Sequence, residues 1–211
     1  MIIAVDGLTA AGKGTLARKL AEHYGFHYLD TGVLYRAVAL EVLRAGKNPT
    51  DPDAAMVAVR KLDLIDFNDP VLRYEQIGNA ASKIGEIFVV RSALLSFQQN
   101  YAIKEPGVVL DGRDIGTVVC QNADVKFFII ASLERRVARR LKELFSNGIT
   151  AIKERVCQEM NERDLRDIER RIAPLTPAAD AVVINTSELN IKEVFDIAVQ
   201  IISEKFNDEY H

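Results

Sequence analysis

The chain has 211 residues, of which 48% are hydrophobic and 27% are charged, a balance that excludes a disordered or fibrous protein and fits one globular domain. Its formal net charge of −3 argues against nucleic acid or an anionic membrane surface as a constitutive partner. No segment approaches the roughly 20 apolar residues of a membrane span, and the N-terminus lacks the features of a signal peptide. We therefore expect a cytoplasmic protein without a membrane or nucleic-acid partner, and we expect it to be a monomer.

Short apolar runs alternate along the chain with longer amphipathic runs. The apolar runs predict strands over residues 2–6, 26–30, 108–111, 125–131 and 181–185. The amphipathic runs predict helices over residues 14–24, 31–45, 52–61, 86–103, 133–145, 152–171 and 191–206. Because a parallel crossover needs about a dozen residues or more, this alternation predicts an α/β fold with a doubly wound, five-stranded parallel sheet.

Single residues refine this prediction. The residues that favour a helix start are Thr31, Asp51, Ser132 and Asn190. Residues 66–70 (DFNDP) indicate a turn. Cys120 and Cys157 are far apart in sequence, which predicts neither a disulfide nor a thiolate zinc site, and both are expected to be buried apolar residues. The three histidines lie outside the motifs discussed below and are expected to be structural or exposed: His23, His27 and His211.

The stretch VDGLTAAGKGTLARKL joins the first predicted strand to the first predicted helix. Its glycines allow backbone N–H groups to converge on phosphate oxygens, the helix N-terminus adds positive potential, and Lys13 reaches the outer phosphates. A flexible glycine-alanine turn is the alternative. In this motif Gly14 rather than a hydroxyl residue follows Lys13, and the hydroxyl comes at Thr15. The expected ATP-binding residues are Gly7, Leu8, Thr9, Ala10, Ala11, Gly12, Lys13, Gly14 and Thr15.

Two further stretches follow predicted strands at the edge where such folds bind ligands. LDTGVLYR places Thr31 at a strand-to-helix junction and Arg36 inside the helix; a helix cap with a solvated arginine is the alternative. VVLDGRDIGT ends an apolar strand in Asp111, where phosphoryl-transfer enzymes place a carboxylate near magnesium. Arg113 and Asp114 follow in the loop, and a plain Asp-Gly turn is the alternative.

The charged stretch ERDLRDIERR places Arg163, Asp167 and Arg170 on one face of a helix. Upstream, Arg135/Arg139 and Arg136/Arg140 form like-charge pairs four residues apart. Such pairs destabilise an isolated helix by a few tenths of a kcal/mol, roughly, so an anion between the guanidinium groups would explain them. The alternative is a solvated surface helix, and we expect most of these arginines to lie at the surface.

Together, the stretches GLTAAGKGT, LDTGVLYR, NAASKIG, DGRDIGT and ERDLRDIERRIAPL, with APLTPAADAVVINTS after them, resemble bacterial cytidylate kinases over nearly the whole chain. Adenylate kinases and eukaryotic UMP/CMP kinases share the phosphate-binding loop (P-loop) but carry a DGFPR-type pattern in place of DGRDIGT. The resemblance implies a P-loop NTPase fold. It also implies an enzyme that transfers the γ-phosphoryl group of ATP to CMP or dCMP, with Mg²⁺. It also implies a core (about 1–30, 105–132 and 173–211), a mobile monophosphate-binding flap (about 31–104) and a helical lid (about 133–172).

The resemblance also implies roles for single residues. The residues matching Thr31, Arg36 and Arg113 hold the acceptor phosphate. Those matching Ser82, Arg91, Asp114 and Arg170 surround the cytosine, and those matching Arg163 and Asp167 reach the ribose or the phosphates. Between Leu62 and Ser82 the chain is shorter than the typical member, which carries a small inserted sheet there.

The acceptor phosphate is already an anion near neutral pH, so the chemistry needs no histidine base. It needs two polyanions held in line, with the charge on the moving group neutralised. The expected catalytic residues are Lys13, Arg36, Asp111, Arg113 and Arg163. No protein ligand set for a metal is assigned, and Mg²⁺ is expected to bind through ATP phosphates and water near Thr15 and Asp111. A P-loop kinase for another small acceptor, such as AMP or shikimate, and a non-catalytic nucleotide-binding module are the alternatives.

Overall fold

The computed structural model describes residues 1–62, 66–67 and 69–207, and within them the predicted doubly wound parallel sheet is confirmed. Its strands pair in parallel in the order β2-β3-β1-β4-β5. The strands are β1 (Ile2–Gly7), β2 (His27–Asp30), β3 (Val108–Gly112), β4 (Val125–Ile130) and β5 (Val182–Asn185). Each predicted strand is present with ends shifted by no more than one residue.

All the predicted helices form, with ends shifted by no more than two residues. They are α1 (Lys13–Tyr24), α2 (Thr31–Arg44), α3 (Pro52–Val59), α5 (Phe88–Ala102), α6 (Leu133–Ser146), α7 (Lys153–Glu169) and α8 (Ile191–Asn207). The Asp51 and Ser132 side chains accept N–H groups of α3 and α6, as expected of caps. Asn190 accepts the N–H groups of Lys192 and Glu193 at 2.9 and 3.0 Å, whereas Thr31 begins α2 and Asp30 occupies the N-cap.

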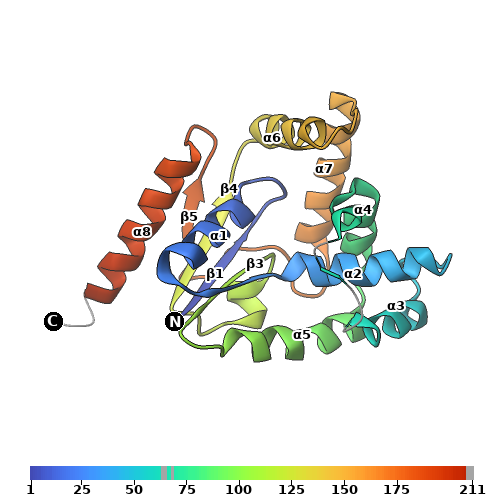
Figure 1. Ribbon diagram of the computed structural model, residues 1–211, viewed down its shortest axis with the longest axis horizontal. Helices are drawn as coiled ribbons and strands as arrows, with labels where there is room; N and C mark the ends of the chain where they lie inside the picture. Colours follow the sequence, from blue (N-terminus) through green and yellow to red (C-terminus); the bar gives the residue numbers. More distant parts are fainter. Residues whose placement is uncertain (63–65, 68, 208–211) are drawn as a thin grey trace.

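Helices cover both faces of the sheet because its strands alternate their apolar side chains. Ile3 and Val5 of β1 point into a core shared with α1 and α8. Ala4 points the other way, into a core shared with the end of α5 and with the segment that follows β3. Figure 1 shows α1 and α8 beside each other along the sheet, with α5 apart from them. The three inner strands β1, β3 and β4 are therefore buried between helical layers, whereas the edge strands β2 and β5 are partly exposed.

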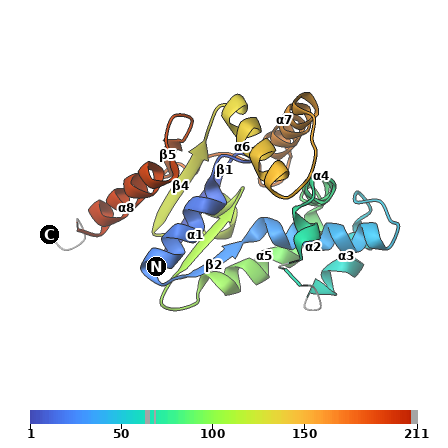
Figure 2. The same ribbon diagram turned by 45° about the horizontal axis from the view of Figure 1, so that its top comes forward.

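Two helical groups stand outside this core (Figures 1 and 2). One consists of α2, α3, α4 and the start of α5, and it encloses its own apolar cluster, which includes Leu34, Ile77 and Leu94. The other consists of α6 and α7, and its cluster includes Val137 and Met160. The division into a core, a mobile flap and a lid stays a prediction, as does the motion of either group.

Among the described residues, three elements were not predicted: the short helix η2 (Pro70–Arg73), α4 (Glu75–Ile84) and the π-helix η3 (Ile115–Val119). The first two lie largely between Leu62 and Ser82, where the resemblance implied a shortened stretch. In the predicted turn at 66–70, Asp69 accepts the N–H of Val71 at 2.9 Å and caps η2, while Asn68 lies outside the described residues.

Within the part of the chain that the structure describes, no helix is both long enough and apolar enough to cross a membrane.

Candidate active site

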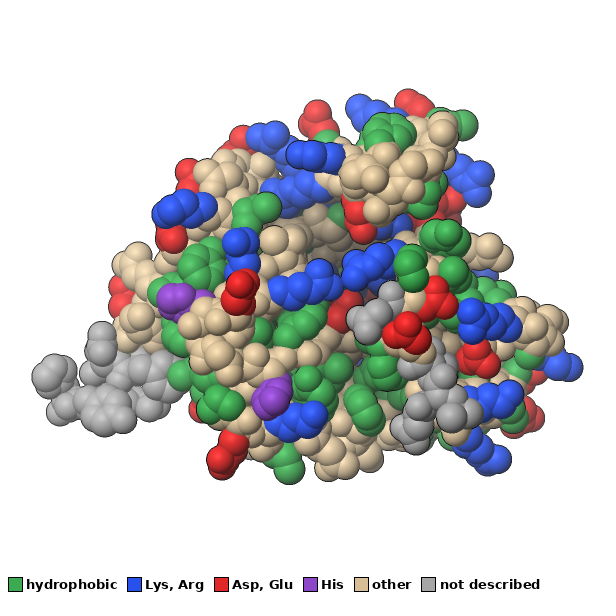
Figure 3. Space-filling view, viewed as in Figure 1, with side chains coloured by type: hydrophobic (Ala, Val, Ile, Leu, Met, Phe, Trp, Pro, Cys, Tyr) green, Lys and Arg blue, Asp and Glu red, His purple; other side chains and the backbone are tan. Residues whose placement is uncertain are grey.

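A cleft of about 1050 Å³ opens at the carboxyl ends of β1, β2 and β3. Its walls come from α1, α2, α4, α5, α6, α7 and the segment that leads into α8. Figure 3 shows this face hollowed near its centre, with Lys and Arg side chains gathered along the hollow. All the predicted site residues except Gly7 and Leu8 line the cleft. The fold therefore brings together groups that are up to 161 residues apart in the sequence, from Thr9 to Arg170.

The P-loop owes its shape to backbone conformations that favour glycine. Gly7 has φ +142°, and a Cβ there would lie 2.0 Å from the carbonyl oxygen of Ile129, so no larger residue fits. Gly12 has φ +102° and precedes α1 without any side-chain cap, which leaves the first N–H groups of the helix free for a ligand. Ala10 also has a positive φ, 56°. Thr9 through Thr15 line the cleft, and Gly7 and Leu8 form the base of the loop.

Lys13 and Asp111 lie together at the floor of the cleft. The Lys13 ammonium donates to the carbonyl of Leu8 at 2.9 Å, and burial together with the nearby Arg113 lowers its pKa to about 7. Asp111 accepts the hydroxyl of Tyr28 at 3.0 Å, and burial together with Asp30 raises the pKa of Asp111 to about 6. An unpaired anion such as a phosphate would favour the charged form of Lys13. The Lys13 side chain is therefore placed to bind an anionic ligand group.

Asp30 is a carboxylate within the stretch LDTGVLYR to which the sequence analysis gave no role in the site. It ends β2 directly beside Asp111 in the pairing of β2 with β3, and it lines the cleft. Its position at the end of an apolar strand, like that of Asp111, was the signal that could have identified it. Between the two strands, Thr31 donates its hydroxyl to the carbonyl of Asp111 at 2.9 Å.

The P-loop is also fixed by three residues of the helical group α6–α7. The Thr9 N–H donates to Asp164 at 3.1 Å, and its carbonyl accepts from Arg136 at 3.2 Å. Arg136 and Asp164 form a buried ion pair with each other. Arg139 donates to the carbonyl of Ala11 at 3.2 Å. The α6–α7 group is therefore fastened to the P-loop by buried polar contacts.

Arg113, Asp167 and Ser82 form a chain of hydrogen bonds across the cleft. Arg113 donates its Nε to Asp167 at 3.0 Å and its Nη2 to the hydroxyl of Thr9 at 3.1 Å. Asp167 accepts the hydroxyl of Ser82 at 3.0 Å with its other oxygen. Although burial opposes ionisation, Arg113 and Arg163 hold the pKa of Asp167 below its usual range. The chain joins α4, the loop after β3, and α7.

Asp114 lies between two arginines. It forms a buried ion pair with Arg91 of α5, and its other oxygen lies 3.5 Å from Nη2 of Arg170. Arg170 also donates its Nε to the carbonyl of Ala173 at 2.6 Å, and the Arg91 guanidinium lies 5.6 Å from the ring centre of Tyr35. These groups, together with Ser82, line one end of the cleft. They offer both donors and an anionic acceptor to a flat polar ring.

Arg36 and Arg163 differ from the other arginines of the cleft. Among the described residues, Nε of each is buried without a hydrogen-bond partner. Burial and the neighbouring Arg113 and Arg36 lower the pKa of Arg163 to about 10. A buried donor without an acceptor is unfavourable unless a ligand supplies the acceptor. This cluster is thus the natural place for an anion.

The expectation that most arginines of the stretch 133–171 lie at the surface is wrong. Arg136 and Arg170 are buried, and Arg139, Arg140, Arg163 and Arg166 are partly buried. In the upstream pairs each arginine also has a protein acceptor, and an anion between them stays a prediction. These acceptors are Glu188 for Arg135, Asp164 for Arg136, Thr186 for Arg139 and Glu75 for Arg140. The fold separates the like charges by directing each side chain to a different carboxylate or carbonyl.

Arg139 and Thr186 are cleft residues that the sequence reasoning did not assign to the site. Arg139 donates to the hydroxyl and carbonyl of Thr186 at 2.9 and 2.6 Å. The partner follows β5, 47 residues away. Thr186 lies in the stretch quoted for the family resemblance, but nothing local in the sequence indicates the contact.

The cysteines and the described histidines lie outside the cleft. His23 and His27 are exposed, as expected, and His211 lies outside the described residues. Cys120 is buried as expected, whereas Cys157 is only partly buried. No group of three or more His, Cys, Asp or Glu side chains that could hold a metal exists in the described ranges.

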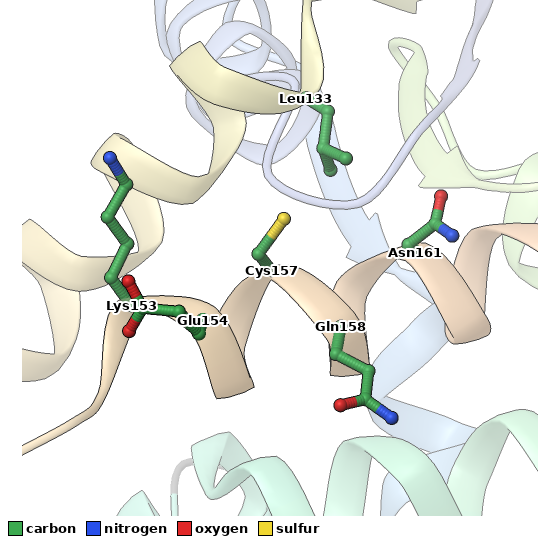
Figure 4. A pocket seen from close by; sticks show the side chains of 6 residues that line it. All are labelled: Leu133, Lys153, Glu154, Cys157, Gln158 and Asn161. Atoms are coloured by element: carbon green, nitrogen blue, oxygen red, sulfur yellow. The ribbon is translucent and has the colours of Figure 1, made fainter.

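A smaller pocket of about 450 Å³ lies between α7 and the start of α6 (Figure 4). Cys157 points towards Leu133 at its centre, while Lys153 and Gln158 point in different directions. Its polar groups do not converge on one point, so the large cleft is the candidate site.

Comparisons with known proteins show a family relationship over nearly the whole chain. A family model described as cytidylate kinase matches residues 3–204. The cytidylate kinase of Paramagnetospirillum magneticum is 52% identical over 207 residues, covering 97% of this chain and 98% of that protein. The cytidylate kinase of Rhodospirillum rubrum is 49% identical over 209 residues, covering 97% of this chain and 98% of that protein.

A solved structure of an uncharacterized protein from Eubacterium ventriosum has the same fold, with a TM-score of 0.56 and 17% identity, covering 97% of this chain and 98% of that chain. At this identity the likeness shows the fold alone.

Proposed function

Because this chain belongs to the cytidylate kinase family, we propose that it transfers the γ-phosphoryl group of ATP to CMP or dCMP, giving ADP and CDP or dCDP. One observation supports this best. The cleft places a P-loop opposite a cluster of arginines, with Asp114 between Arg91 and Arg170 at one end. The P-loop suits a nucleoside triphosphate, and the arginine cluster suits the phosphate of the acceptor. Asp114 with its two arginines suits a base that carries both a hydrogen-bond donor and acceptors.

The acceptor phosphate fits the cluster of Arg36, Arg113 and Arg163. Arg36 and Arg163 each have a buried Nε without a partner, and Arg113 is directed into the cleft by Thr9 and Asp167. Guanidinium groups bind phosphate oxygens through paired N–H groups, so a few arginines fix both its position and its orientation. Thr31 lies beside them at the start of α2, where backbone N–H groups also favour an anion.

The base fits the end of the cleft that contains Asp114. Cytosine carries an exocyclic amino donor where uracil carries a carbonyl oxygen. A carboxylate has about four lone-pair sites, so Asp114 can accept this amino group while it pairs with Arg91 and Arg170. Ser82 and the two arginines then face the remaining polar edge of the ring. Uracil would place a carbonyl oxygen against the carboxylate, which disfavours it.

In the reaction, an oxygen of the acceptor phosphate attacks the γ-phosphorus of ATP. The bond between this phosphorus and the oxygen that bridges it to the β-phosphorus breaks, and ADP leaves with the electron pair. No proton has to be removed from the acceptor, so no general base is needed. Lys13 and the arginines neutralise the charge that spreads over the transferred group, and they hold donor and acceptor in line.

Mg²⁺ fits the site as a partner of ATP rather than as an ion held by the protein alone. In the described part of the chain no cluster of side chains could hold a metal by itself. A Cβ at Gly14 would lie 3.0 Å from the carboxylate of Asp111, so this carboxylate adjoins the first turn of α1. Asp111, Asp30 and the exposed hydroxyl of Thr15 are the oxygen groups that would hold the ion through water and ATP phosphates. The ion would supply positive charge to the phosphates.

The proposal also covers the oligomeric state, the partners and the cellular location of the enzyme. All the groups that it uses come from one chain, which supports a monomer. The net charge of −3 gives no reason to expect a nucleic-acid or membrane partner. Nucleotides as both substrates favour the cytoplasm.

A coupled assay of ADP production tests the proposal. The acceptors are CMP, dCMP, UMP, AMP and shikimate, with Mg-ATP as the donor and a reaction without acceptor as the blank. We expect kcat/KM for CMP and dCMP to exceed the value for UMP by roughly ten- to a few hundred-fold. Preference for AMP or shikimate would make this a P-loop kinase of another specificity. Nucleotide binding without transfer to any acceptor would make it a binding module.

A further inference from the structure

Asp6 is a buried carboxylate that the proposed mechanism does not use. It lies near the end of β1, directly before the P-loop, with 5% of its surface exposed, and it does not line the cleft. Its Oδ1 accepts the N–H of Ile115 and its Oδ2 accepts the N–H of Gly116, each at 2.8 Å. Both oxygens are thus engaged by neighbouring backbone groups 109 and 110 residues away in the sequence.

The two N–H groups are the first of η3, which begins directly after Asp114. The first N–H groups of a helical segment have no partner inside it, and the residue at the N-cap commonly satisfies them with its own side chain. Asp114 occupies the N-cap of η3, and an aspartate there is well suited to that role. Its side chain makes no such bond and pairs with Arg91 and Arg170 instead.

We propose that Asp6 is a positioning residue for base recognition: it caps η3 from another strand and thereby leaves the carboxylate of Asp114 free to face the acceptor base. This inference rests on the proposed function. Without Asp6, the unsatisfied N–H groups of Ile115 and Gly116 would compete for the Asp114 carboxylate. The backbone of β1 strengthens the link, because Asp6 pairs in register with Gly112, two residues before Asp114.

The carboxylate form of the side chain matters. Asparagine has nearly the same shape but only one acceptor oxygen, and its NH₂ group would face an N–H donor. Asp6→Asn therefore removes one of the two bonds and adds a repulsive contact, with little change in volume. The chain also offers a matched control. Asp124 accepts the N–H of Ile2 at 2.6 Å, at the far end of the same strand and away from the cleft.

The experiment compares Asp6→Asn and Asp124→Asn with the wild type by thermal unfolding and by kcat/KM for CMP, UMP and ATP. We expect Asp6→Asn to raise KM for CMP about tenfold, to narrow the CMP/UMP ratio of kcat/KM, and to change KM for ATP less than about twofold. Asp124→Asn keeps an oxygen that can accept the single N–H, so both Tm and the ratio should stay close to the wild type. Equal losses with CMP and UMP in Asp6→Asn would make Asp6 merely structural, and a larger change in KM for ATP would place its effect on the P-loop; either result overturns the inference.

A double-variant cycle tests the route of the effect. If Asp6 acts through Asp114, the CMP/UMP ratio of the double variant Asp6→Asn/Asp114→Asn equals that of Asp114→Asn alone. If the two reductions multiply, Asp6 acts elsewhere and the inference is wrong. Should the wild type itself show no preference for CMP, the proposed function fails, independently of these variants.

Hydrogen exchange in the intact wild type covers the case in which Asp6→Asn does not fold. The Ile115 and Gly116 amides should exchange slowly, at rates similar to those of the β1 amides. Fast exchange at either amide would show that Asp6 does not cap η3.

Discussion

The two walls of the cleft are built in different ways. The donor wall is the P-loop, a continuous stretch from Gly7 to Thr15 whose shape comes from backbone conformation at positions such as Gly7 and Gly12. The acceptor wall comes from α2, α4, α5, the loop after β3 and α7, which meet only in the folded protein. Ion pairs between arginines and aspartates hold these segments together, as in Arg113 with Asp167 and Arg91 with Asp114.

Because the two walls are built differently, a substitution should have different effects in each of them. A backbone cradle binds phosphate with main-chain groups, so a change in one of its side chains acts locally and affects every acceptor equally. In the acceptor wall Arg91, Arg113 and Asp167 each also contact a neighbouring polar side chain, so a change at one of them should affect the others. We expect the bound acceptor to replace some hydrogen bonds within the acceptor wall, such as the one from Ser82 to Asp167 at 3.0 Å.

The largest effect is expected for Lys13→Ala in the donor wall. The variant removes a charge that we expect to contact the phosphates but little packing, since within the described chain the ammonium makes its one hydrogen bond to the Leu8 carbonyl, at 2.9 Å. We expect kcat to fall by about 10² to 10³-fold with CMP and UMP alike, with the fold retained. Lys19→Ala, on the exposed face of the same helix, is the control and should match the wild type in kcat and Tm. Unchanged turnover of Lys13→Ala with CMP would contradict the P-loop assignment.

The next effect is expected for lysine variants in the acceptor wall. Arg113→Lys keeps the charge but loses the fork that reaches both Thr9 and Asp167, and Arg36→Lys loses paired contacts to phosphate. We expect kcat/KM for CMP to fall by about ten- to a hundredfold in each, with KM for ATP changed less than about threefold. Arg44→Lys, at the exposed end of α2, is the control. If both variants matched the wild type, neither arginine would hold the acceptor phosphate.

A smaller effect, confined to base choice, is expected for Asp114→Asn. An amide can present its oxygen to the cytosine amino group or its NH₂ to the uracil carbonyl, so the CMP/UMP ratio of kcat/KM should narrow about tenfold. The narrowing should come mainly from weaker CMP use, since the variant also weakens the contacts with Arg91 and Arg170. Steady-state kinetics with both acceptors measure it. An unchanged ratio would show that Asp114 does not read the base.

The smallest effect is expected for the pH dependence of ATP affinity, which involves Lys13 in the donor wall. In the free protein, burial and Arg113 lower the pKa of Lys13 to about 7, whereas bound phosphates favour its charged form and raise that pKa. ATP binding therefore takes up a proton above pH 7, and affinity falls as the pH rises. If the pKa in the complex is well above 8, the Kd for ATP should rise about fivefold from pH 7 to pH 8.

Calorimetry in buffers of different ionisation enthalpy measures this proton uptake directly. Lys13→Met should abolish it, because methionine does not titrate. Uptake that persists in Lys13→Met would assign the proton to another group.

Local patterns were sufficient for much of the fold. Strand and helix positions followed from the alternation of apolar and amphipathic runs. The helix α4 was missed, although Ile77, Ala80, Ala81 and Ile84 have helical spacing and are buried on one face. That spacing is visible in the sequence, within the stretch that contains NAASKIG and Ser82. The burial of Arg136 and Arg170, in contrast, could not be predicted locally, because it depends on Asp164 and Asp114.

The P-loop could be predicted from local sequence, because consecutive residues form the cradle with their backbone and glycine permits the positive φ angles that it needs. The covering of parallel strands by helices on both faces could be predicted in the same way. The strand order β2-β3-β1-β4-β5 and the partner of each charged side chain in the acceptor wall depend instead on long-range packing. The capping of η3 by Asp6 belongs to this second class. Its donors lie 109 and 110 residues away, and a buried carboxylate is satisfied by whichever N–H groups the fold brings within reach, not by its neighbours in sequence.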